Sequence, residues 1–419
     1  MAKLKNINGH FVESDYENAL IAFLEREGWQ YLFGDSITRA NRKEVLYMDD
    51  LLQFLKDNYK NVKDEELQRI ADNVRLVGAD SDFATLHKVY KWMVNGVPAV
   101  DKDGRPTTVN LIDFSCVDNP EAKNTNFFRV VNQFTVEYMN NGVTKNRRPD
   151  VLLYVNGIPV CVIELKNPAD ANATIEDAWE QINIRYWRDI PGLLHYCPLA
   201  CISDGVKTRL GTVRTPYEHF YAWRRVENGD KVSTMPFDEL ETMVRGVYRP
   251  ERFLEIFRDY VYFQDENFDS DEKEIVCRYP QFFATRLLRE SVIKSVKTKS
   301  GKGGTYFGAT GCGKTYTMAF LARQLSLRCA AEIGSPTILM IVDREDLQKQ
   351  GAKLFTKSTE FLGLGEVSVV PSRKKLREEL SLRDSGGFFI CTIQKFCDRK
   401  DDPIGLVNDR SNIICFSDE

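Results

Sequence analysis

The sequence predicts an α/β protein with two sheet-containing domains, and three observations support this fold class. Short β-rich runs broken by Gly, Asn and Pro fill residues 100–162, and the helical patterns around them indicate a mixed central sheet. From about residue 277 helical and strand patterns alternate, which implies a parallel sheet covered by helices. The 419 residues are 43% hydrophobic and 28% charged, a composition that can bury real cores.

The first domain is expected to begin with a helix over residues 15–30, for which Ser14 is a plausible N-cap and Gly28 a natural C-cap. A charged helical stretch at 44–96 follows. The next expected elements are β-rich runs at 109–114, 127–131, 134–138 and 151–155, a helix at 174–188 and a buried strand at 199–202. We assign residues 1–228 to this domain and interpret 229–276, which is charged and largely helical, as a connector.

The second domain is expected to span residues 277–419. Its predicted elements, in order, are a helix at 280–297, a strand near 304–307, a helix at 314–328, a strand at 337–342, a helix at 344–357 and strands at 388–391 and 412–416.

Composition and charge exclude several classes of protein. The net charge of -4 argues against a protein that coats DNA by bulk charge alone. The 10 cysteines include no CxxC pair, which indicates reduced thiols. His195, Cys197, Cys201 and His219 are interpreted as core residues, because structural zinc sites pair their ligands more tightly. No apolar run approaches the roughly 20 residues needed to cross a bilayer, so we expect no membrane contact and a cytoplasmic location.

A phosphate-binding loop is the most specific motif. The segment Gly308-Ala-Thr-Gly-Cys-Gly313-Lys314-Thr315 satisfies G-x-x-x-x-G-K-[ST] between an expected strand and an expected helix. Backbone N–H groups from Gly308, Thr310, Gly311 and Gly313 would turn toward the phosphates of ATP, Lys314 would neutralise the β and γ phosphates, and Thr315 would coordinate Mg²⁺. The alternative is a Gly-rich turn that only caps a helix.

Two carboxylates follow the last expected strand, Ile413-Ile-Cys-Phe-Ser-Asp418-Glu419. The carboxyl end of a strand is the edge where an open α/β sheet binds ligands. Asp418 would then hold Mg²⁺ through water, and Glu419 would orient an attacking water. The alternative is a plain solvated terminus. Because the chain stops here, we expect no second nucleotide-binding domain to complete the site with an arginine finger, and we expect the sheet itself to lack strands.

A hairpin carries the second candidate site. Asn156-Gly157 separates two apolar runs, which is the strongest short hairpin signal. A strict two-residue turn would pair Val155 with Ile158 and leave Asp150 and Glu164 on opposite faces. A three-residue loop or a bulge shifts the pairing by one residue, so that Asp150 faces Glu164 at about 5 Å.

We predict the loop or the bulge, because two carboxylates on one face can share Mg²⁺ and Lys166 beside them can position an attacking water. The alternative is an exposed hairpin with a cross-strand salt bridge. The run Val160-Cys-Val-Ile163 before Glu164 looks buried on both faces, which argues against a solvated ion pair.

The motifs together resemble a known family. Asp150 with Glu164-Leu-Lys166 resembles the PD-(D/E)xK nuclease core, and its combination with the downstream motifs is similar to the N-terminal part of the restriction (R) subunit of type I restriction-modification enzymes. Further stretches share the resemblance: Thr108–Asp113, Asn126–Phe128, Ser203–Gly205, Gly211-Thr212, Arg278–Gln281, Val342–Gln350 and Thr392–Phe396.

The resemblance implies a nuclease domain followed by an incomplete RecA-like domain. It implies that Asp150 and Glu164 ligate the catalytic metal and that Lys166 supports the nucleophile. Glu17 resembles the upstream acidic residue of the family, although Ser14-Asp-Tyr-Glu17 also fits a capping box. Gln281 resembles the adenine-reading glutamine of superfamily-two helicases, the alternative being a plain surface glutamine.

Two departures from the family pattern lie near these residues. The family carries Gln-x-x-x-Tyr on the helix after the hairpin, but here Tyr186 is five residues beyond Gln181 and Arg185 takes the expected tyrosine place. Gln181 stays a candidate, whereas the role of Tyr186 is in doubt. The phosphate loop carries Cys312 where the family often has Ser, a small-for-small change that leaves an oxidisable thiol.

The implied function is an ATP- and Mg²⁺-dependent endonuclease and translocase of double-stranded DNA, whose partners are methyltransferase and specificity subunits. Segments 342–350 and 392–396 resemble translocase motifs. The alternative is that they are a surface helix and a surface loop. Two rival hypotheses stay open: another nuclease-helicase, such as a type III restriction or anti-phage effector, and a truncated, non-catalytic ATP- or partner-binding fragment. Because family members continue with a His, a second RecA-like domain and a methyltransferase-docking part, we expect negligible ATPase from this chain alone.

Overall fold

The structure, a computed structural model, describes residues 13–167, 174–232, 238–264, 272–363, 365–397 and 404–418. The chain divides into two compact units. Unit 1 comprises Met1–Arg258 and Glu274–Arg278, and unit 2 comprises Asp259–Lys273 and Tyr279–Glu419. The segment interpreted as a connector, 229–276, is therefore shared between the two units.

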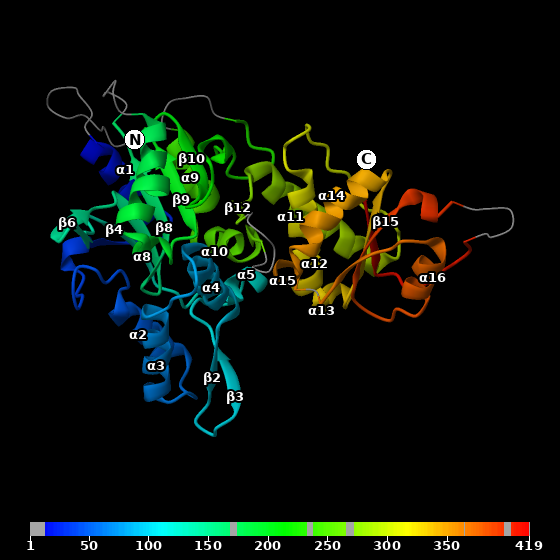
Figure 1. Ribbon diagram of the computed structural model, residues 1–419, viewed down its shortest axis with the longest axis horizontal. Coiled ribbons are helices and arrows are strands. Elements are labelled where there is room, and N and C mark those ends of the chain that lie inside the picture. Colours follow the sequence, from blue (N-terminus) through cyan, green and yellow to red (C-terminus); the bar gives the residue numbers. More distant parts are fainter. Residues whose placement is uncertain are drawn as a thin grey trace. The chain divides into compact units, whose positions relative to one another are not determined.

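Unit 1 contains the mixed sheet that the sequence predicts (Figure 1). Its strand order is β1-β4-β7-β8-β9-β10. Strands β1 and β4 pair in parallel, as do β8 and β9, and the other neighbours are antiparallel. The strand bounds are β1 Gln30–Phe33, β4 Phe128–Asn132, β7 Val151–Val155, β8 Ile158–Leu165, β9 Leu199–Ser203 and β10 Thr208–Thr212.

The two central strands, β7 and β8, are buried along their whole length, because other elements cover both faces of the sheet. Their Asn156-Gly157 turn has φ of 51° and 76°, the left-handed values that a tight two-residue hairpin turn requires. The turn is itself buried, and its Asn156 side chain is satisfied there by donating to the carbonyl of Leu111 at 2.9 Å. The hairpin signal in the sequence is confirmed.

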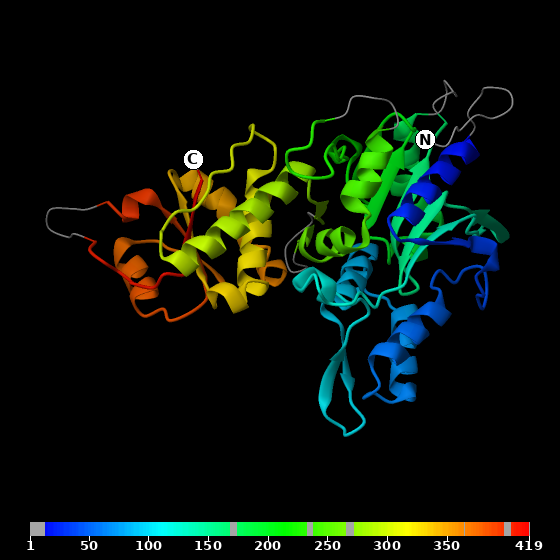
Figure 2. The same cartoon turned by 180° about the vertical axis from the view of Figure 1, so that it is seen from behind.

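Helices surround this sheet. α1 and α9 contact each other, α1 and α6 contact β8, and α6 also contacts β9. Away from the sheet, α2, α3 and the β2–β3 hairpin extend together from unit 1, as Figures 1 and 2 both show. The helices are α1 Glu13–Arg26, α2 Met48–Asn58, α3 Asp64–Arg75, α4 Asp82–Asn95, α5 Ser115–Asp118, α6 Ile175–Glu180, α7 Trp187–Asp189, α8 Pro191–Leu194, α9 Asp238–Val247 and α10 Pro250–Asp259. The remaining strands are β2 Val97–Val100, β3 Pro106–Val109, β5 Val136–Asn140, β6 Val143–Arg147 and β12 Glu274–Val276.

Unit 2 contains the predicted parallel sheet, in the order β14-β15-β13-β16. Its strands are β13 Thr337–Val342, β14 Val367–Val369, β15 Phe388–Thr392 and β16 Ile413–Asp418, and β11 Val261–Phe263 lies outside this sheet. Its helices are α11 Tyr279–Thr298, α12 Lys314–Leu327, α13 Ala330–Ile333, α14 Glu345–Thr356, α15 Thr359–Leu362 and α16 Arg373–Ser381. On one face of the sheet, Leu339, Phe389 and Cys391 pack against Leu376 and Leu380 of α16.

Two predicted strands are wrong. Residues 304–307 form no strand, because no described strand pairs with them, and Phe307 is 94% exposed. Most of the run 109–114 is also irregular, since β3 ends at Val109. There the Asn126 side chain bonds to the backbone N–H and C=O of Asp113, so the segment is satisfied without a neighbouring strand. Within the described residues, no helix is both long and apolar enough to span a bilayer.

Candidate functional site

The first part of the site lies where the β7–β8 hairpin ends. The pairing begins with Val155 opposite Ile158, as a two-residue turn requires, and shifts by one residue between Leu153 and Tyr154. Beyond this bulge Val151 pairs with Ile163, so the same register sets Asp150 opposite Glu164. The predicted bulge is confirmed, and the alternative three-residue loop is absent from this hairpin.

Glu164 is fully buried on β8, and Asp150 is half-buried. Burial, followed by the negative charge of Asp150, raises the pKa of the Glu164 carboxyl well above its ordinary value. The backbone N–H of Leu165 donates to Asp150 Oδ2 at 2.7 Å and so fixes Asp150 next to its partner. Two carboxyl groups crowded in this way favour the binding of a shared proton or cation.

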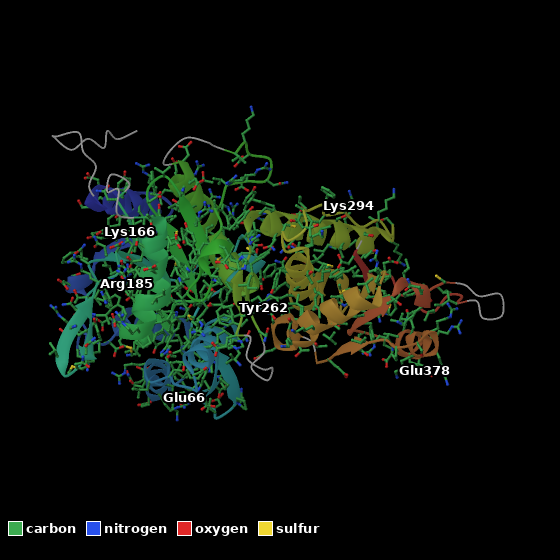
Figure 3. The ribbon with its side chains drawn as sticks, turned by 45° about the horizontal axis from the view of Figure 1, so that its top comes forward. Glu66, Lys166, Arg185, Tyr262, Lys294 and Glu378 are labelled. Carbon is green, nitrogen blue, oxygen red and sulfur yellow. The ribbon has the colours of Figure 1, made fainter. Side chains whose placement is uncertain are left out.

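A network of side chains joins Glu164 to Lys166. Gln181 Nε2 donates to Glu164 Oε2 at 2.7 Å, and the Tyr186 hydroxyl donates to Glu164 Oε1 at 2.6 Å. The ammonium of Lys166 donates to Gln181 Oε1 at 3.0 Å. The structure therefore brings together Asp150, Glu164, Lys166 and Gln181, and it adds Tyr186. Figure 3 labels both Lys166 and Arg185. The side chain of Arg185 is 44% exposed, and it lies outside this network.

Glu17 lies on α1 and is almost buried. Its carboxylate accepts hydrogen bonds from Asn132 Nδ2 and, at 3.3 Å, from Gln133 Nε2. α1 begins at Glu13, so Ser14 lies inside the helix and is not the N-cap that the alternative capping box requires. Asn132 pairs with Val151, the residue after Asp150, so Glu17 is held beside the same strand ends.

The donor set fits a divalent cation, because carboxylate oxygens are the ligands that hard cations take. Asp150 and Glu164 supply two such groups. Across the described ranges, however, no three His, Cys, Asp or Glu side chains converge as a complete metal cage. The protein side of the site is therefore a carboxylate pair, and Glu17 is not a third member of it.

The second part of the site is the phosphate loop of unit 2. Gly311 and Gly313 have φ of 79° and 86°, left-handed values that favour glycine. α12 begins directly afterwards at Lys314, as predicted. The Lys314 ammonium donates to the carbonyl of Gly308 at 3.2 Å, and Thr315 is half-buried in the first turn of the helix. Thr310 is exposed on the loop.

Gln281 is buried on α11, against the phosphate loop. Its amide nitrogen donates to the carbonyl of Gly313 at 3.0 Å and lies 3.4 Å from that of Cys312. A Cβ atom at Gly313 would lie only 2.5 Å from this nitrogen. Gln281 is thus a brace for the loop, and the alternative of a plain surface glutamine does not hold.

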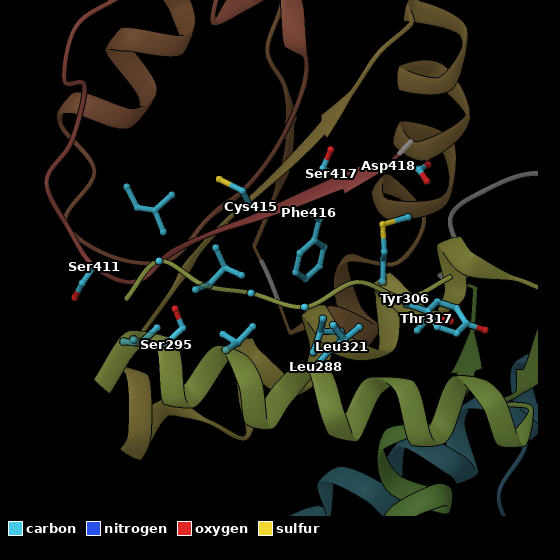
Figure 4. A pocket seen from close by; sticks show the side chains of 18 of the residues that line it. Leu288, Ser295, Tyr306, Thr317, Leu321, Ser411, Cys415, Phe416, Ser417 and Asp418 are labelled. Carbon is cyan, nitrogen blue, oxygen red and sulfur yellow. The ribbon is translucent and has the colours of Figure 1, made fainter. Parts of the chain in front are cut away.

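A cavity of about 660 Å³ connects the loop to the last strand. Lys314, Thr317 and Asp418 are among the residues that line it. Figure 4 shows Phe416 and Asp418 of β16 across from Leu288 of α11. The lysine of the loop and the predicted magnesium-binding aspartate therefore share one cavity, whereas Glu419 lies outside the described residues.

The two segments that resemble translocase motifs meet at the carboxyl ends of neighbouring parallel strands. Asp343 follows β13, and Gln394 follows β15. Gln394 Nε2 donates to the carbonyl of Asp343 at 2.7 Å. The structure thus links 342–350 with 392–396 through the backbone of the first segment.

Sequence reasoning missed Asn132 and Gln133 and left Tyr186 in doubt. Their position in the sequence could have identified Asn132 and Gln133. Like Asp150 and Glu164, they are polar residues at or next to the end of a buried strand. Gln133 also has φ of 52°, uncommon for a residue with a side chain, and such backbone strain gathers at functional sites.

Comparison with known proteins shows which family the chain is similar to. Residues 10–219, half of the chain, match the family described as type I restriction enzyme R protein N terminus (HSDR_N), and residues 280–419 match SWI2/SNF2 ATPase. The MjaIXP endonuclease subunit of Methanocaldococcus jannaschii, named for a putative type I restriction enzyme, is 31% identical over 97% of this chain and 40% of its own length. The type I restriction enzyme HindI endonuclease subunit of Haemophilus influenzae is 28% identical over 97% of this chain and 38% of its own length.

The chain spans about two fifths of the length of these relatives. Its two matched regions follow the order that the motifs predict, an R-protein N terminus and then an ATPase region. The resemblance drawn from the motifs is confirmed, and the chain belongs to the family of type I restriction enzyme R proteins.

Proposed function

We propose that this chain provides the nuclease and part of the motor of a type I restriction endonuclease subunit. It would cleave DNA phosphodiester bonds with Mg²⁺ and, within the whole enzyme, use ATP to translocate double-stranded DNA. The observation that carries this proposal is the bulged hairpin, which sets Asp150 opposite Glu164 and places Lys166 just beyond β8. The two relatives above are both named as endonuclease subunits, which supports it.

Asp150 and Glu164 would hold the Mg²⁺, and the mixed sheet that carries them would be a PD-(D/E)xK nuclease fold. When bound, the ion would lower the pKa of water and neutralise charge on the scissile phosphate. Lys166 would position the attacking water, because its ammonium is held beside the acid pair by its 3.0 Å hydrogen bond to the amide oxygen of Gln181. Glu17, fixed by Asn132, would orient substrate or water at the edge of the site.

Residues 277–419 would form the first motor domain, with 1–228 as the nuclease domain. Lys314 and the backbone of the phosphate loop would bind the phosphates of ATP, and Thr315 and Asp418 would hold its Mg²⁺. Gln281 would read the nucleotide while it supports Gly313. Because the chain carries a mild negative charge, sequence recognition would fall to partner specificity and methyltransferase subunits.

The test is DNA cleavage and ATP hydrolysis by the full-length subunit, reconstituted with its methyltransferase and specificity partners. Asp150→Ala or Lys166→Ala should abolish cleavage and leave ATP hydrolysis intact, since both residues lie in unit 1 and the phosphate loop in unit 2. Asp57→Ala, which removes an exposed carboxylate on α2, serves as the control and should change neither activity. Retained cleavage by either site variant would remove that residue from the site.

A further inference from the structure

The helix after the hairpin changes its winding next to the acid pair. α6 is α-helical up to Glu180, residues Gln181–Tyr186 form one π-helical turn, and α7 follows. In a regular α-helix, residues five apart are rotated by about 140° and cannot share a face. In a π turn the i→i+5 hydrogen bond places them one above the other. The π turn therefore puts Tyr186 on the face of Gln181.

This shared face is directed at Glu164. The Tyr186 hydroxyl accepts a hydrogen bond from Gln181 Nε2 at 2.8 Å and donates its own to Glu164 Oε1 at 2.6 Å. Gln181 donates to the other carboxylate oxygen at 2.7 Å. Glu164 and Tyr186 are both fully buried, so these donors, rather than solvent, fix the plane of the carboxylate.

We propose that the π turn is a one-residue register correction that makes Tyr186 a positioning residue for the divalent ion. Tyr186 and Gln181 orient the Glu164 carboxylate toward the ion, and Gln181 carries the same alignment on to Lys166. The proposal rests on the proposed nuclease function. It resolves the spacing anomaly, because the extra residue between Gln181 and Tyr186 is taken up by the winding and the pair still meets.

The alternative is that Tyr186 only fills the core and bonds to whichever acceptor is near. A core role would make its hydroxyl matter for stability alone. A positioning role makes it matter for the affinity of the ion, because partners that orient a ligating group typically change metal affinity or activity by about 10–100-fold. The two roles therefore differ in a measurable quantity.

The first experiment removes the hydroxyl. Tyr186→Phe should raise the Mg²⁺ concentration for half-maximal cleavage by the reconstituted enzyme roughly tenfold or more. It should also weaken Mn²⁺ binding by the chain without DNA, measured by calorimetry, to a similar degree. Tyr196→Phe is the matched control, because that buried tyrosine also loses its hydroxyl, which donates to the carbonyl of Val74 at 2.8 Å, away from the site.

The second experiment removes the extra residue. Ile184 is 49% exposed within the π turn, so its deletion shortens the spacing to four and lets a regular α-helix restore the same face. The deletion variant should keep Mn²⁺ affinity within about threefold of wild type. Inserting one Ala after Ile184 instead should lower the affinity at least as much as Tyr186→Phe.

The outcomes separate the two proposals. If Asp150→Ala still cleaves, the nuclease assignment fails. If Asp150→Ala is inactive but Tyr186→Phe binds Mn²⁺ as Tyr196→Phe does, only the positioning role fails. If deletion of Ile184 weakens binding as much as Tyr186→Phe, the π turn is required in itself and is no register correction.

Discussion

Replacing Glu164 with glutamine should make the ion-free protein more stable and remove its stabilisation by Mg²⁺. Burial and the charge of Asp150 raise the pKa of Glu164 above its ordinary value of 4.5. Between pH 4.5 and this raised pKa, the folded state holds a proton that the unfolded state has released. The contribution of this group to folding is therefore lost as pH rises through the folded pKa. The amide introduced by Glu164→Gln cannot ionise, and the stability of the variant should not fall with pH in this way.

The substitution should keep all but one of the hydrogen bonds to residue 164. The carbonyl oxygen of the new amide can accept from Gln181 Nε2, as Glu164 Oε2 now does. Its NH₂ group can donate to Tyr186, because a hydroxyl both accepts and donates. The Tyr186 hydroxyl then loses the acceptor of its own proton, and this loss offsets part of the stability gained from the removed charge in the absence of metal.

The magnitude follows from linkage between binding and folding. At a Mg²⁺ concentration of one hundred times its Kd, the ion should stabilise the wild-type protein by about 2.7 kcal/mol. For a unit of this size that corresponds to a rise in Tm of roughly 5–11 °C. Glu164→Gln loses one of two carboxylate ligands, and its Tm should respond little to the same addition.

The assay is thermal unfolding of the chain in chelator and in Mg²⁺, across neutral and acidic pH. Glu274→Gln is the control: Glu274 is also buried in unit 1, and burial raises its pKa, but it is not part of the acid pair. It should raise stability in chelator and leave the Mg²⁺ response at the wild-type level. Equal Mg²⁺ stabilisation of Glu164→Gln and wild type would refute a metal site at this pair.

Three further predictions concern other parts of the chain. Lys314→Ala removes the ammonium that now contacts Gly308, and binding of an ATP analogue by the chain should weaken roughly tenfold to a hundredfold in a fluorescence titration; unchanged affinity would remove Lys314 from the nucleotide site. Gly157→Ala would place a Cβ 2.0 Å from the carbonyl of Tyr47 at a φ of +76°, so urea unfolding should show a loss of about 2–4 kcal/mol; a loss below the measurement error would contradict the turn geometry. Burial lowers the pKa of His87 from 6.5 to about 3, so only the unfolded chain gains this proton between those values. Unit 1 should therefore lose about 2 kcal/mol of stability from pH 7 to pH 5, and His87→Leu should flatten that slope.

The β7–β8 hairpin shows which features of the site local sequence patterns can predict. Asn156-Gly157 predicts the tight turn, and the burial of the following run predicts covered strands. The bulge does not follow from either, because both registers suit the same apolar residues. It could be predicted only from chemistry, since a shared ion requires Asp150 and Glu164 on one face.

Other features depended on contacts that sequence patterns do not contain. Residues 304–307 have strand composition, but a strand exists only where a neighbour supplies hydrogen bonds, and pairing is decided by distant residues. Spacing rules for a regular helix placed Tyr186 away from Gln181, because they cannot anticipate a π turn. Gln281 was predicted as a nucleotide contact, yet its packing under Gly313 depends on how α11 crosses the loop.

Three irregular features of unit 1 contact the acidic residues that the sequence predicted. The bulge brings Asp150 to Glu164, the π turn brings Tyr186 to Glu164, and the left-handed Gln133 reaches Glu17. Each departs from the regular geometry of its strand or helix, and a left-handed residue such as Gln133 costs of order 1–3 kcal/mol unless the surroundings compensate. Folding alone gives no reason for three such departures in one neighbourhood. A site that must hold buried acidic groups at fixed positions does, because regular strands and helices would direct these side chains to different faces.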